Sequence, residues 1–190
     1  MPAKPSKYYI RRKAAHPESQ VLVLKQNDTF AVFDAFGDVQ PDGIGQQGLY
    51  HQGTRFLSKC ILHLGAHRPL LLSSTVRRDN VLLGVDLANA DVFSRSGEVL
   101  LPRGTLHLYR TKFLWSGVCY ERLRIHNYGL TPVEAVFSLR FDADFADVFE
   151  VRGQMREKTG LRTGPIVEED GIALEYCGLD GVKRDRKSVV

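Results

Sequence analysis

The sequence lacks a long hydrophobic run. No uninterrupted apolar stretch approaches the roughly 18 residues that suggest a membrane-spanning helix. Residues 1–20 are interrupted by prolines and basic residues and do not form the apolar core of a secretory signal peptide. We therefore expect a cytoplasmic chain that does not associate with a membrane.

Cysteine is scarce. Cys60, Cys119 and Cys177 are odd in number and widely separated, which favours three buried free thiols over a disulfide framework or a zinc site. His63 and His67 have the spacing of two zinc ligands on a helix, but a glycine between them predicts a turn, and no third ligand is apparent. We expect no metal and no cofactor.

Motifs for nucleophilic catalysis and phosphate binding are also missing. No serine lies in a Gly-x-Ser-x-Gly elbow. The glycine-rich segment 35–48 has no Gly-Lys-Ser/Thr ending, so it is not a P-loop. We interpret it as a flexible surface connection, although its length leaves room for a role in binding.

Positive charge is concentrated near the two ends. Residues 1–20 carry a net +4 and residues 183–187 a net +3, so the rest of the chain carries a net −3 out of the total of +4. A nucleic-acid-binding module usually carries its positive charge as a patch on the folded body. We therefore expect no nucleic-acid partner.

What the sequence does contain is a succession of short strand patterns separated by turns. The clearest group comprises strands within residues 105–115, 118–127 and 133–141, joined by turns at 116–117 and 128–132. In the second strand, Cys119, Leu123 and Ile125 alternate with basic residues, as in a half-buried strand. We expect these strands to form a meander within an all-β fold, an antiparallel β-sandwich with very little helix.

The ends of the chain differ from its middle. Residues 1–20 are basic and proline-containing and predict a flexible N-terminal arm, so the ordered domain is expected to span residues 21–190. The last residues, GLDGVKRDRKSVV (178–190), have the pattern of a further strand. We expect the natural chain to continue past Val190.

The segment FDADFADVFEVRG (residues 141–153) concentrates acidic residues among aromatic ones, with candidate functional residues Asp144, Asp147, Glu150 and Arg152. Carboxylates in such a group can bind sugar hydroxyls, hold a metal, or act as the acid and base of glycoside hydrolysis. The structural alternative is that they cap and solvate a turn, with Asp144 as the helix N-cap. Neither alternative is excluded by the pattern alone.

Three aromatic residues are candidates for stacking on sugar rings: Trp115, Tyr109 and Tyr120. Aromatic side chains serve equally well in core and hairpin packing. The sequence leaves both roles open.

Several phrases together resemble a known family. They are GLYHQGTRFLSK (48–59), RPLLLSS (68–74), NVLLGVDLANAD (80–91), HNYG (126–129), FDADFADVFEVRG (141–153) and YCGLDGVKR (176–184). They are similar to the N-terminal domain of bacterial glycogen-debranching-enzyme-like proteins, the amylo-α-1,6-glucosidase family. The resemblance runs from about Val21 to the end of the chain, and the phrase ending in EVRG is its most specific part.

The resemblance implies a supersandwich-like β-domain placed ahead of a catalytic (α/α)6 barrel, with the acid and base carboxylates in that barrel. We therefore expect no catalytic residue and no enzymatic activity in this chain alone, and a glycoside hydrolase as its full-length parent. The domain would brace the barrel and line its glucan-binding cleft, with Asp144, Asp147, Glu150 and Arg152 at the junction. The alternative is an autonomous carbohydrate-binding module that binds α-glucan through Trp115, Tyr109 and Tyr120.

Overall fold

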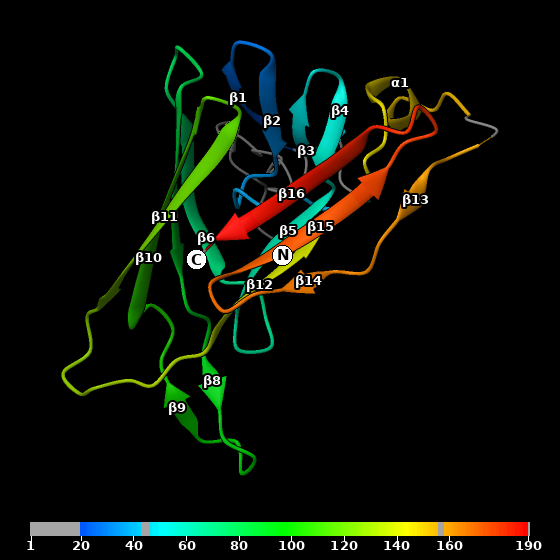
Figure 1. Ribbon diagram of the computed structural model, residues 1–190. Helices are drawn as coiled ribbons and strands as arrows, with labels where there is room; N and C mark the ends of the chain where they lie inside the picture. Colours follow the sequence, from blue (N-terminus) through cyan, green and yellow to red (C-terminus); the bar gives the residue numbers. More distant parts are fainter. Residues whose placement is uncertain (1–19, 43–45, 156–157, 190) are drawn as a thin grey trace, which may run out of the picture.

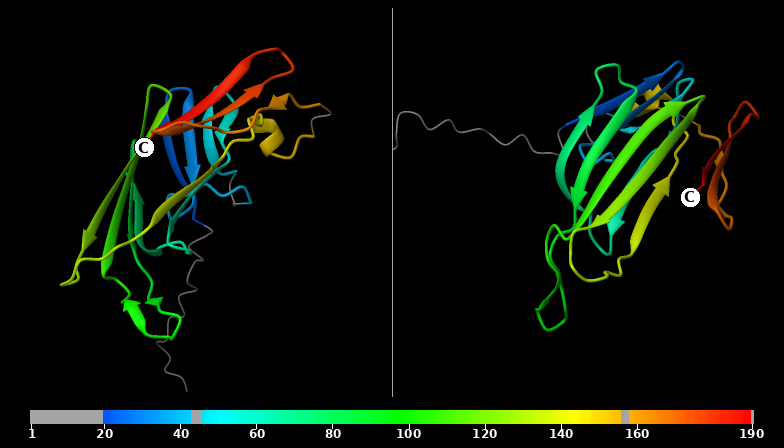
Figure 2. Two further views of the ribbon diagram at one scale, coloured as in Figure 1. Left: turned by 60° about the horizontal axis from the view of Figure 1, so that its bottom comes forward. Right: turned by 90° about the vertical axis from the view of Figure 1, so that its left-hand side faces the viewer.

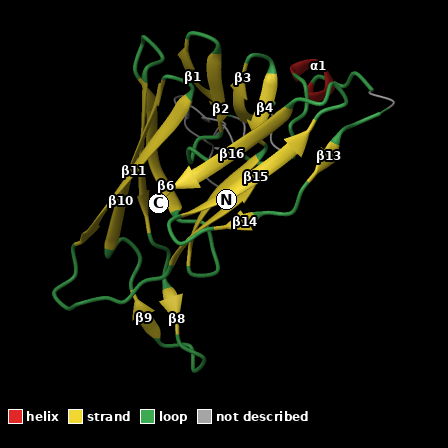
Figure 3. Cartoon of the chain, in the orientation of Figure 1, coloured by secondary structure: helices red, strands yellow, loops and turns green. Residues whose placement is uncertain are grey.

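The computed structural model describes residues 20–42, 46–155 and 158–189, so most of the predicted N-terminal arm, residues 1–19, lies outside it. Of the described residues, 55% are in strands and 2% in helix, and all the strand pairs among them are antiparallel (Figure 3). The predicted all-β antiparallel fold is confirmed. Within the described residues, no helix has the length and apolar character needed to cross a membrane.

The elements follow one another in short steps. They are β1 (Leu22–Gln26), β2 (Thr29–Phe33), β3 (Gly48–His51), β4 (Thr54–Leu57), β5 (Lys59–Leu64), β6 (Leu70–Val76), β7 (Leu82–Ala88), β8 (Val92–Phe93), β9 (Val99–Leu101), β10 (Leu106–Trp115), β11 (Val118–Asn127), β12 (Phe137–Asp142), α1 (Val148–Val151), β13 (Leu161–Arg162), β14 (Ile166–Val167), β15 (Gly171–Cys177) and β16 (Lys183–Val189).

The strands form two main sheets with smaller additions (Figure 1). Sheet I has the order β1-β2-β3-β4, and sheet II has the order β11-β10-β7-β6. β5 pairs with β12, while β13, β14 and β16 pair with β15 to form sheet III. The β8–β9 hairpin projects from the end of the body away from α1. Sheet II forms one layer of a β-sandwich, and sheet I with the β5–β12 pair forms the other.

The core lies between these layers because each main strand turns alternate apolar residues inward. β10 illustrates the pattern, with Leu106, Leu108 and Leu114 buried on the inner face and its odd-numbered residues on the outer face of sheet II. The buried cluster comprises Leu22, Leu24, Ala31, Phe33, Val39, Leu49, Leu57, Cys60, Leu62, Leu83, Val85, Leu87, Leu106, Leu108 and Leu114.

The predicted three-stranded meander is wrong in its third strand. The hairpin turn at 116–117 is confirmed, since β10 and β11 pair without a break from Trp115–Val118 to Leu106–Asn127. The next strand, β12, leaves sheet II and pairs with β5 in the other layer. Alternation along a strand indicates its buried face but does not select its neighbour, and both layers offered an apolar face.

The cysteine prediction also needs a correction. The structure has three free thiols among the described residues, but only Cys60 is buried. Cys119 and Cys177 are half-buried; Cys119 lies on the edge strand β11 of sheet II, and Cys177 is the last residue of β15. Burial raises the pKa of the Cys60 and Cys119 thiols, which keeps them protonated near neutral pH.

The segment between β2 and β3 is not the flexible surface connection that its composition indicated; its residues 43–45 lie outside the described part. Asp34 and Asp38 are both buried. Asp34 accepts hydrogen bonds from the backbone amides of Phe36 and Asp38, and its other oxygen accepts from Arg68 Nη2 at 2.6 Å. Long-range partners therefore hold the segment against the core.

Arg110 connects this segment to sheet II. Its side chain is 0% exposed, and its guanidinium donates to Asp38 Oδ1 at 2.6 Å and to Glu121 Oε1 at 2.7 Å. Lys112, also on the inner face of β10, binds the other Glu121 oxygen at 2.8 Å. Burial alone would raise the pKa of Glu121, but Lys112 and Arg110 outweigh burial and lower that pKa to about 2.

We predict that Arg110→Met destabilises the chain by about 3–5 kcal/mol, because it removes the buried guanidinium that bridges the carboxylates of Asp38 and Glu121. The free energy of unfolding in urea measures this effect. Arg122→Met is the matched control, since Arg122 lies on the outer face of β11 and its loss should cost less than about 0.5 kcal/mol. Equal losses in the two variants would contradict a special role for the buried network.

Candidate functional site at the corner beside α1

The acidic segment 141–153 turns away from β12 and runs antiparallel along β4. The amide of Ser58 donates to the carbonyl of Asp142 at 2.9 Å, and the amide of Arg55 donates to the carbonyl of Ala146 at 2.8 Å. At the end of this run, the amide of Val148 donates to the carbonyl of Gly53 at 2.8 Å. These three bonds fix the backbone from which the candidate carboxylates project.

Asp144 is held by an arginine from β4. Arg55 Nε donates to Asp144 Oδ1 at 3.0 Å, and Nη2 bonds the other carboxylate oxygen, so the pair is bidentate. Burial alone would lower the pKa of Arg55, but Asp144 outweighs it and raises that pKa. Arg55 Nη1 also donates to the carbonyl of Gln47, which links the corner to the β2–β3 segment.

Asp147, and not Asp144, is the N-cap of α1. Its carboxylate accepts a hydrogen bond from the amide of Phe149 at 2.8 Å, and Glu150 Oε2 accepts from the amide of Asp147 at 2.8 Å. These reciprocal bonds form a capping box, which satisfies amides that a helix start leaves without partners. The prediction that Asp144 is the helix N-cap is wrong: its carboxylate binds Arg55 and accepts a hydrogen bond from the amide of Ala146 at 3.3 Å, before the helix begins.

An aromatic pair forms the centre of the corner. Phe145 and Tyr176 are both buried and stack with ring centroids 5.4 Å apart and an interplanar angle of 10°. Phe56 of β4 meets Phe145 edge-to-face at 5.7 Å. Phe145 has a positive φ of 54°, an uncommon conformation for a non-glycine residue, and this packing holds it there. The pair joins the acidic segment to β15.

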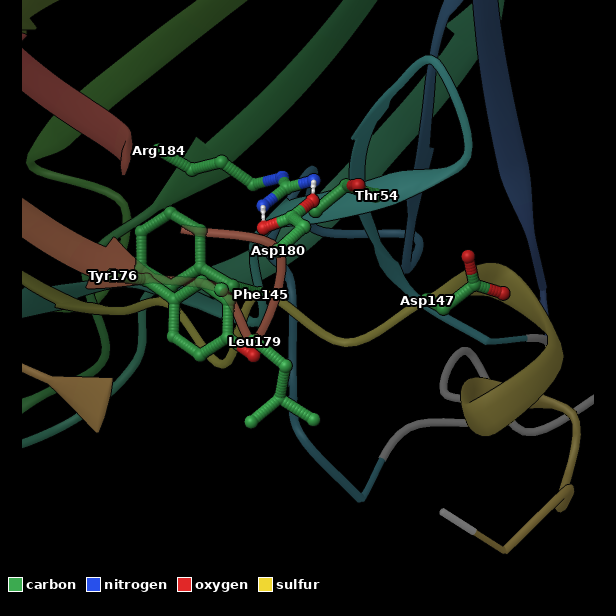
Figure 4. A pocket seen from close by; sticks show the side chains of 8 residues that line it. Thr54, Phe145, Asp147, Tyr176, Leu179, Asp180 and Arg184 are labelled. Carbon is green, nitrogen blue, oxygen red and sulfur yellow. Dashed lines mark hydrogen bonds and ion pairs between the residues drawn. The ribbon is translucent and has the colours of Figure 1, made fainter. Parts of the chain in front are cut away.

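Two hollows flank this aromatic pair. The first, of about 250 Å³, is lined by Thr54, Phe145, Asp147, Tyr176, Gly178, Leu179, Asp180 and Arg184. The second, of about 260 Å³, is lined by Asp144, Phe145, Ala146, Glu150, Thr159, Gly160, Arg162 and Tyr176. Figure 4 shows the first, with the Arg184–Asp180 ion pair next to the stacked rings and Asp147 farther from them, at the start of α1.

The charges at the rim of the first hollow are paired. Arg184 Nη2 lies 2.9 Å from Asp180 Oδ2, and hydrogen bonding from Arg184 lowers the pKa of Asp180 to about 2. Asp180 therefore stays ionised at any physiological pH. A carboxylate accepts hydrogen bonds from hydroxyl groups and a guanidinium donates them, so the rim suits a polar, hydroxyl-rich surface or ligand.

The fourth predicted site residue, Arg152, lies at the C-terminal end of α1 and is exposed. Its Nε donates to Gln46 Oε1 at 3.4 Å. Phe149 on the same helix is 59% exposed. The structure thus brings Asp144, Asp147, Glu150 and Arg152 together at one corner, with the three carboxylates engaged in bonds that shape it.

The predicted sugar-stacking residues lie elsewhere. Tyr109, Trp115 and Tyr120 all belong to the outer face of sheet II, which the right-hand view of Figure 2 presents. Tyr120 stacks on Phe113 with centroids 4.9 Å apart. Tyr109 lies over Gly84 of β7, where an added Cβ would approach the phenol oxygen to 2.9 Å. The three aromatics share a face, and that face is separate from the corner beside α1.

Several residues of the corner carried no role in the sequence-based prediction. They are Arg55, Tyr176, Asp180 and Arg184. The available signal was the phrase YCGLDGVKR, in which Asp180 and Arg184 are spaced to pair across the turn before β16. Arg55 had no comparable signal, because its partner Asp144 is distant in the sequence.

Comparison with known proteins gives one match. A family model described as the N-terminal domain of (some) glycogen debranching enzymes matches residues 24–189. No curated protein and no solved structure matches the chain. The family match covers both main sheets, the corner beside α1 and sheet III.

We predict that Asp147→Ala lowers the free energy of unfolding by about 1 kcal/mol, because an amide at the start of α1 loses its acceptor. Asp147→Asn is the matched variant, since the asparagine oxygen still accepts that bond, and it should cost only a few tenths of a kcal/mol. Urea unfolding measures both. If the asparagine variant loses as much unfolding free energy as the alanine variant, the negative charge of Asp147 contributes more to stability than its capping hydrogen bond.

Proposed function

This chain belongs to the family of N-terminal domains of glycogen debranching enzymes, and from that membership we propose that it is a non-catalytic domain bracing a catalytic barrel. The parent in this proposal is a cytoplasmic glycoside hydrolase of the amylo-α-1,6-glucosidase type. The corner beside α1 contacts the barrel and lines one rim of its glucan-binding cleft. The partners are therefore the barrel of the same polypeptide and, at the cleft, α-glucan.

The observation that carries this proposal is the engagement of the corner's carboxylates. Asp144 is bound by Arg55, while Asp147 and Glu150 form the capping box. A general acid or base must exchange its proton with substrate, which these structural bonds oppose. Groups fixed in this way are better suited to present a rigid surface to a neighbouring domain.

The composition of the corner's surface supports a contact role. Phe149 exposes an aromatic ring next to the charged Arg152, and Met155 beyond them is 95% exposed. Aromatic residues, methionine and arginine are the residue types enriched in protein interfaces. In the parent enzyme, burial of Phe149 against the barrel would stabilise the assembled protein.

We predict that Phe149→Ala costs about 1.5–3 kcal/mol of unfolding free energy in the full-length enzyme, the value of a buried phenylalanine side chain. In the 190-residue chain alone the same change should cost less than about 0.5 kcal/mol, because the ring is exposed there. Chemical denaturation of both proteins gives the two values.

Phe93→Ala is the matched control for this experiment. Phe93 is 58% exposed on the β8–β9 hairpin, at the opposite end of the body from α1. The Phe93→Ala substitution should lower the free energy of unfolding only slightly in either protein. Equal losses of unfolding free energy for the two substitutions in the full-length enzyme would contradict docking through the corner. A separate assay tests the non-catalytic role: glucose release from a branched glucan by the 190-residue chain alone would contradict it.

A second candidate function is α-glucan binding by the outer face of sheet II. The observation in its favour is that Tyr109, Trp115 and Tyr120 share that face, with Trp115 63% exposed. Exposed aromatic faces stack on the apolar faces of sugar rings, and nearby polar groups bind the hydroxyls. Asp86, which bonds Ser73 and His107 on the same face, is such a group.

The single tryptophan makes this candidate testable in the 190-residue chain. If the face binds α-glucan, maltoheptaose should change the fluorescence of Trp115 in a saturable way. Tyr120→Ala should weaken the interaction about tenfold, the effect of losing one aromatic contact of about 1.4 kcal/mol. Unchanged emission at millimolar maltoheptaose, or an equal response to a β-linked glucan, would remove α-glucan binding by this face.

A further inference from the structure

Strand β11 forms an uncovered edge of sheet II. It pairs only with β10 among the strands that the structure describes, and β12, the next strand in sequence, pairs with β5. The right-hand view of Figure 2 shows β11 at the margin of the sheet. The strand is ten residues long, contains no proline, and keeps an unbroken register with β10. Proteins ordinarily protect such long, regular edges with bulges, prolines or covering segments.

The turn at its start determines which backbone groups of β11 face outward. Ser116 and Gly117 both have positive φ, 48° and 78°, as in a two-residue type I′ hairpin. In that geometry Trp115 and Val118 exchange both backbone hydrogen bonds, and the bonded pairs then alternate along the ladder. The amides and carbonyls of Cys119, Glu121, Leu123 and Ile125 therefore point away from β10 toward the open edge.

The inner face of this edge is apolar except at Glu121, whose carboxylate is bound by Arg110 and Lys112. Cys119 and Leu123 are half-buried against the core, and Ile125 is 44% exposed. Phe137 and Leu139 of β12 also reach the core without being fully buried. A strand added next to β11 would place alternate side chains over these residues and remove their exposed apolar surface from water.

The outer face of the edge is basic. Arg122 and Arg124 lie there with His126, and no carboxylate in the described part of the chain pairs with either arginine. Antiparallel pairing with a second copy of β11 is disfavoured, because each face-aligned register that covers most of the strand opposes like charges. Depending on the register, these are Glu121 with itself, Arg122 with itself, Arg122 with Arg124, or Arg124 with itself.

We propose that the edge of β11 accepts an extended segment of the parent enzyme from outside this domain, with apolar residues on its inner face and acidic residues on its outer face. The segment extends sheet II by one strand through backbone hydrogen bonds, the mode of recognition called β-augmentation. Acidic side chains opposite Arg122 and Arg124 select the segment and its register. The source of the segment rests on the proposed function, since the family places this domain ahead of further enzyme polypeptide.

Amide hydrogen exchange of the 190-residue chain, read by NMR, tests this inference. Without a partner, the amides of Glu121, Leu123 and Ile125 should exchange quickly while those of Arg122 and Arg124 are protected. A short peptide that alternates glutamate with valine, at millimolar concentration, should slow the outward amides about tenfold or more. A peptide alternating lysine with valine is the matched control and should leave them fast.

Two variants sharpen the test. Ile125→Pro removes an outward amide without breaking a bond to β10, so it should abolish the protection, whereas Ile125→Ala should retain most of it. The double change Arg122→Glu and Arg124→Glu should reverse the preference from the glutamate peptide to the lysine peptide. This reversal does not depend on the proline variant remaining folded.

Three results would overturn the inference. They are equal protection by both peptides, no protection by either, or protection that appears with protein concentration alone, which indicates a second copy at the edge. These readouts come from β11 in the isolated chain. Their failure leaves the docking of Phe149 in the full-length enzyme intact, and the failure of that docking leaves the β11 result intact.

Discussion

The buried ion pairs around Arg110 are the constraint on which the rest of the structure depends. Arg110 occupies an inward position of β10 that the strand pattern would otherwise give to an apolar residue, and its side chain is inaccessible to solvent. A buried charge is tolerated only when partners compensate its desolvation. Asp38 and Glu121 provide that compensation, so the β2–β3 segment and β11 must both be correctly placed around β10.

The same constraint extends to the candidate site through the β2–β3 segment. Asp34 and Asp38 fix its first half through Arg68 and Arg110. Near the end of the segment, the side-chain oxygen of Gln47 accepts a hydrogen bond from the backbone amide of Gln40. The backbone carbonyl of Gln47 accepts one from Arg55. Arg55 in turn binds Asp144. A continuous set of polar contacts therefore connects the interior of the sandwich to the corner beside α1, which favours a rigid corner suited to contact another domain.

The predicted and observed structures agree where the determinants are local. The turn at 116–117 follows from a glycine that accepts positive φ, and the basic and apolar faces of β11 follow from its alternation. They differ where a distant residue intervenes. The β2–β3 segment was interpreted as a flexible connection because the arginines that pair with its acids, Arg110 of β10 and Arg68 before β6, are far away in the sequence. Asp144 was interpreted as a cap because Arg55 is far from it in sequence.

The sequence by itself determined the all-β class, the alternating faces of β11 and β12 and the resemblance to the debranching-enzyme N-terminal domain. These properties depend on the period-two alternation of side chains and on short phrases of adjacent residues. Only the tertiary structure decided that β12 pairs with β5, that Arg55 binds Asp144, and that the edge of β11 stays open. The physical reason is that sheet order and ion pairing join residues far apart in the chain, and many distant partners satisfy the same local pattern.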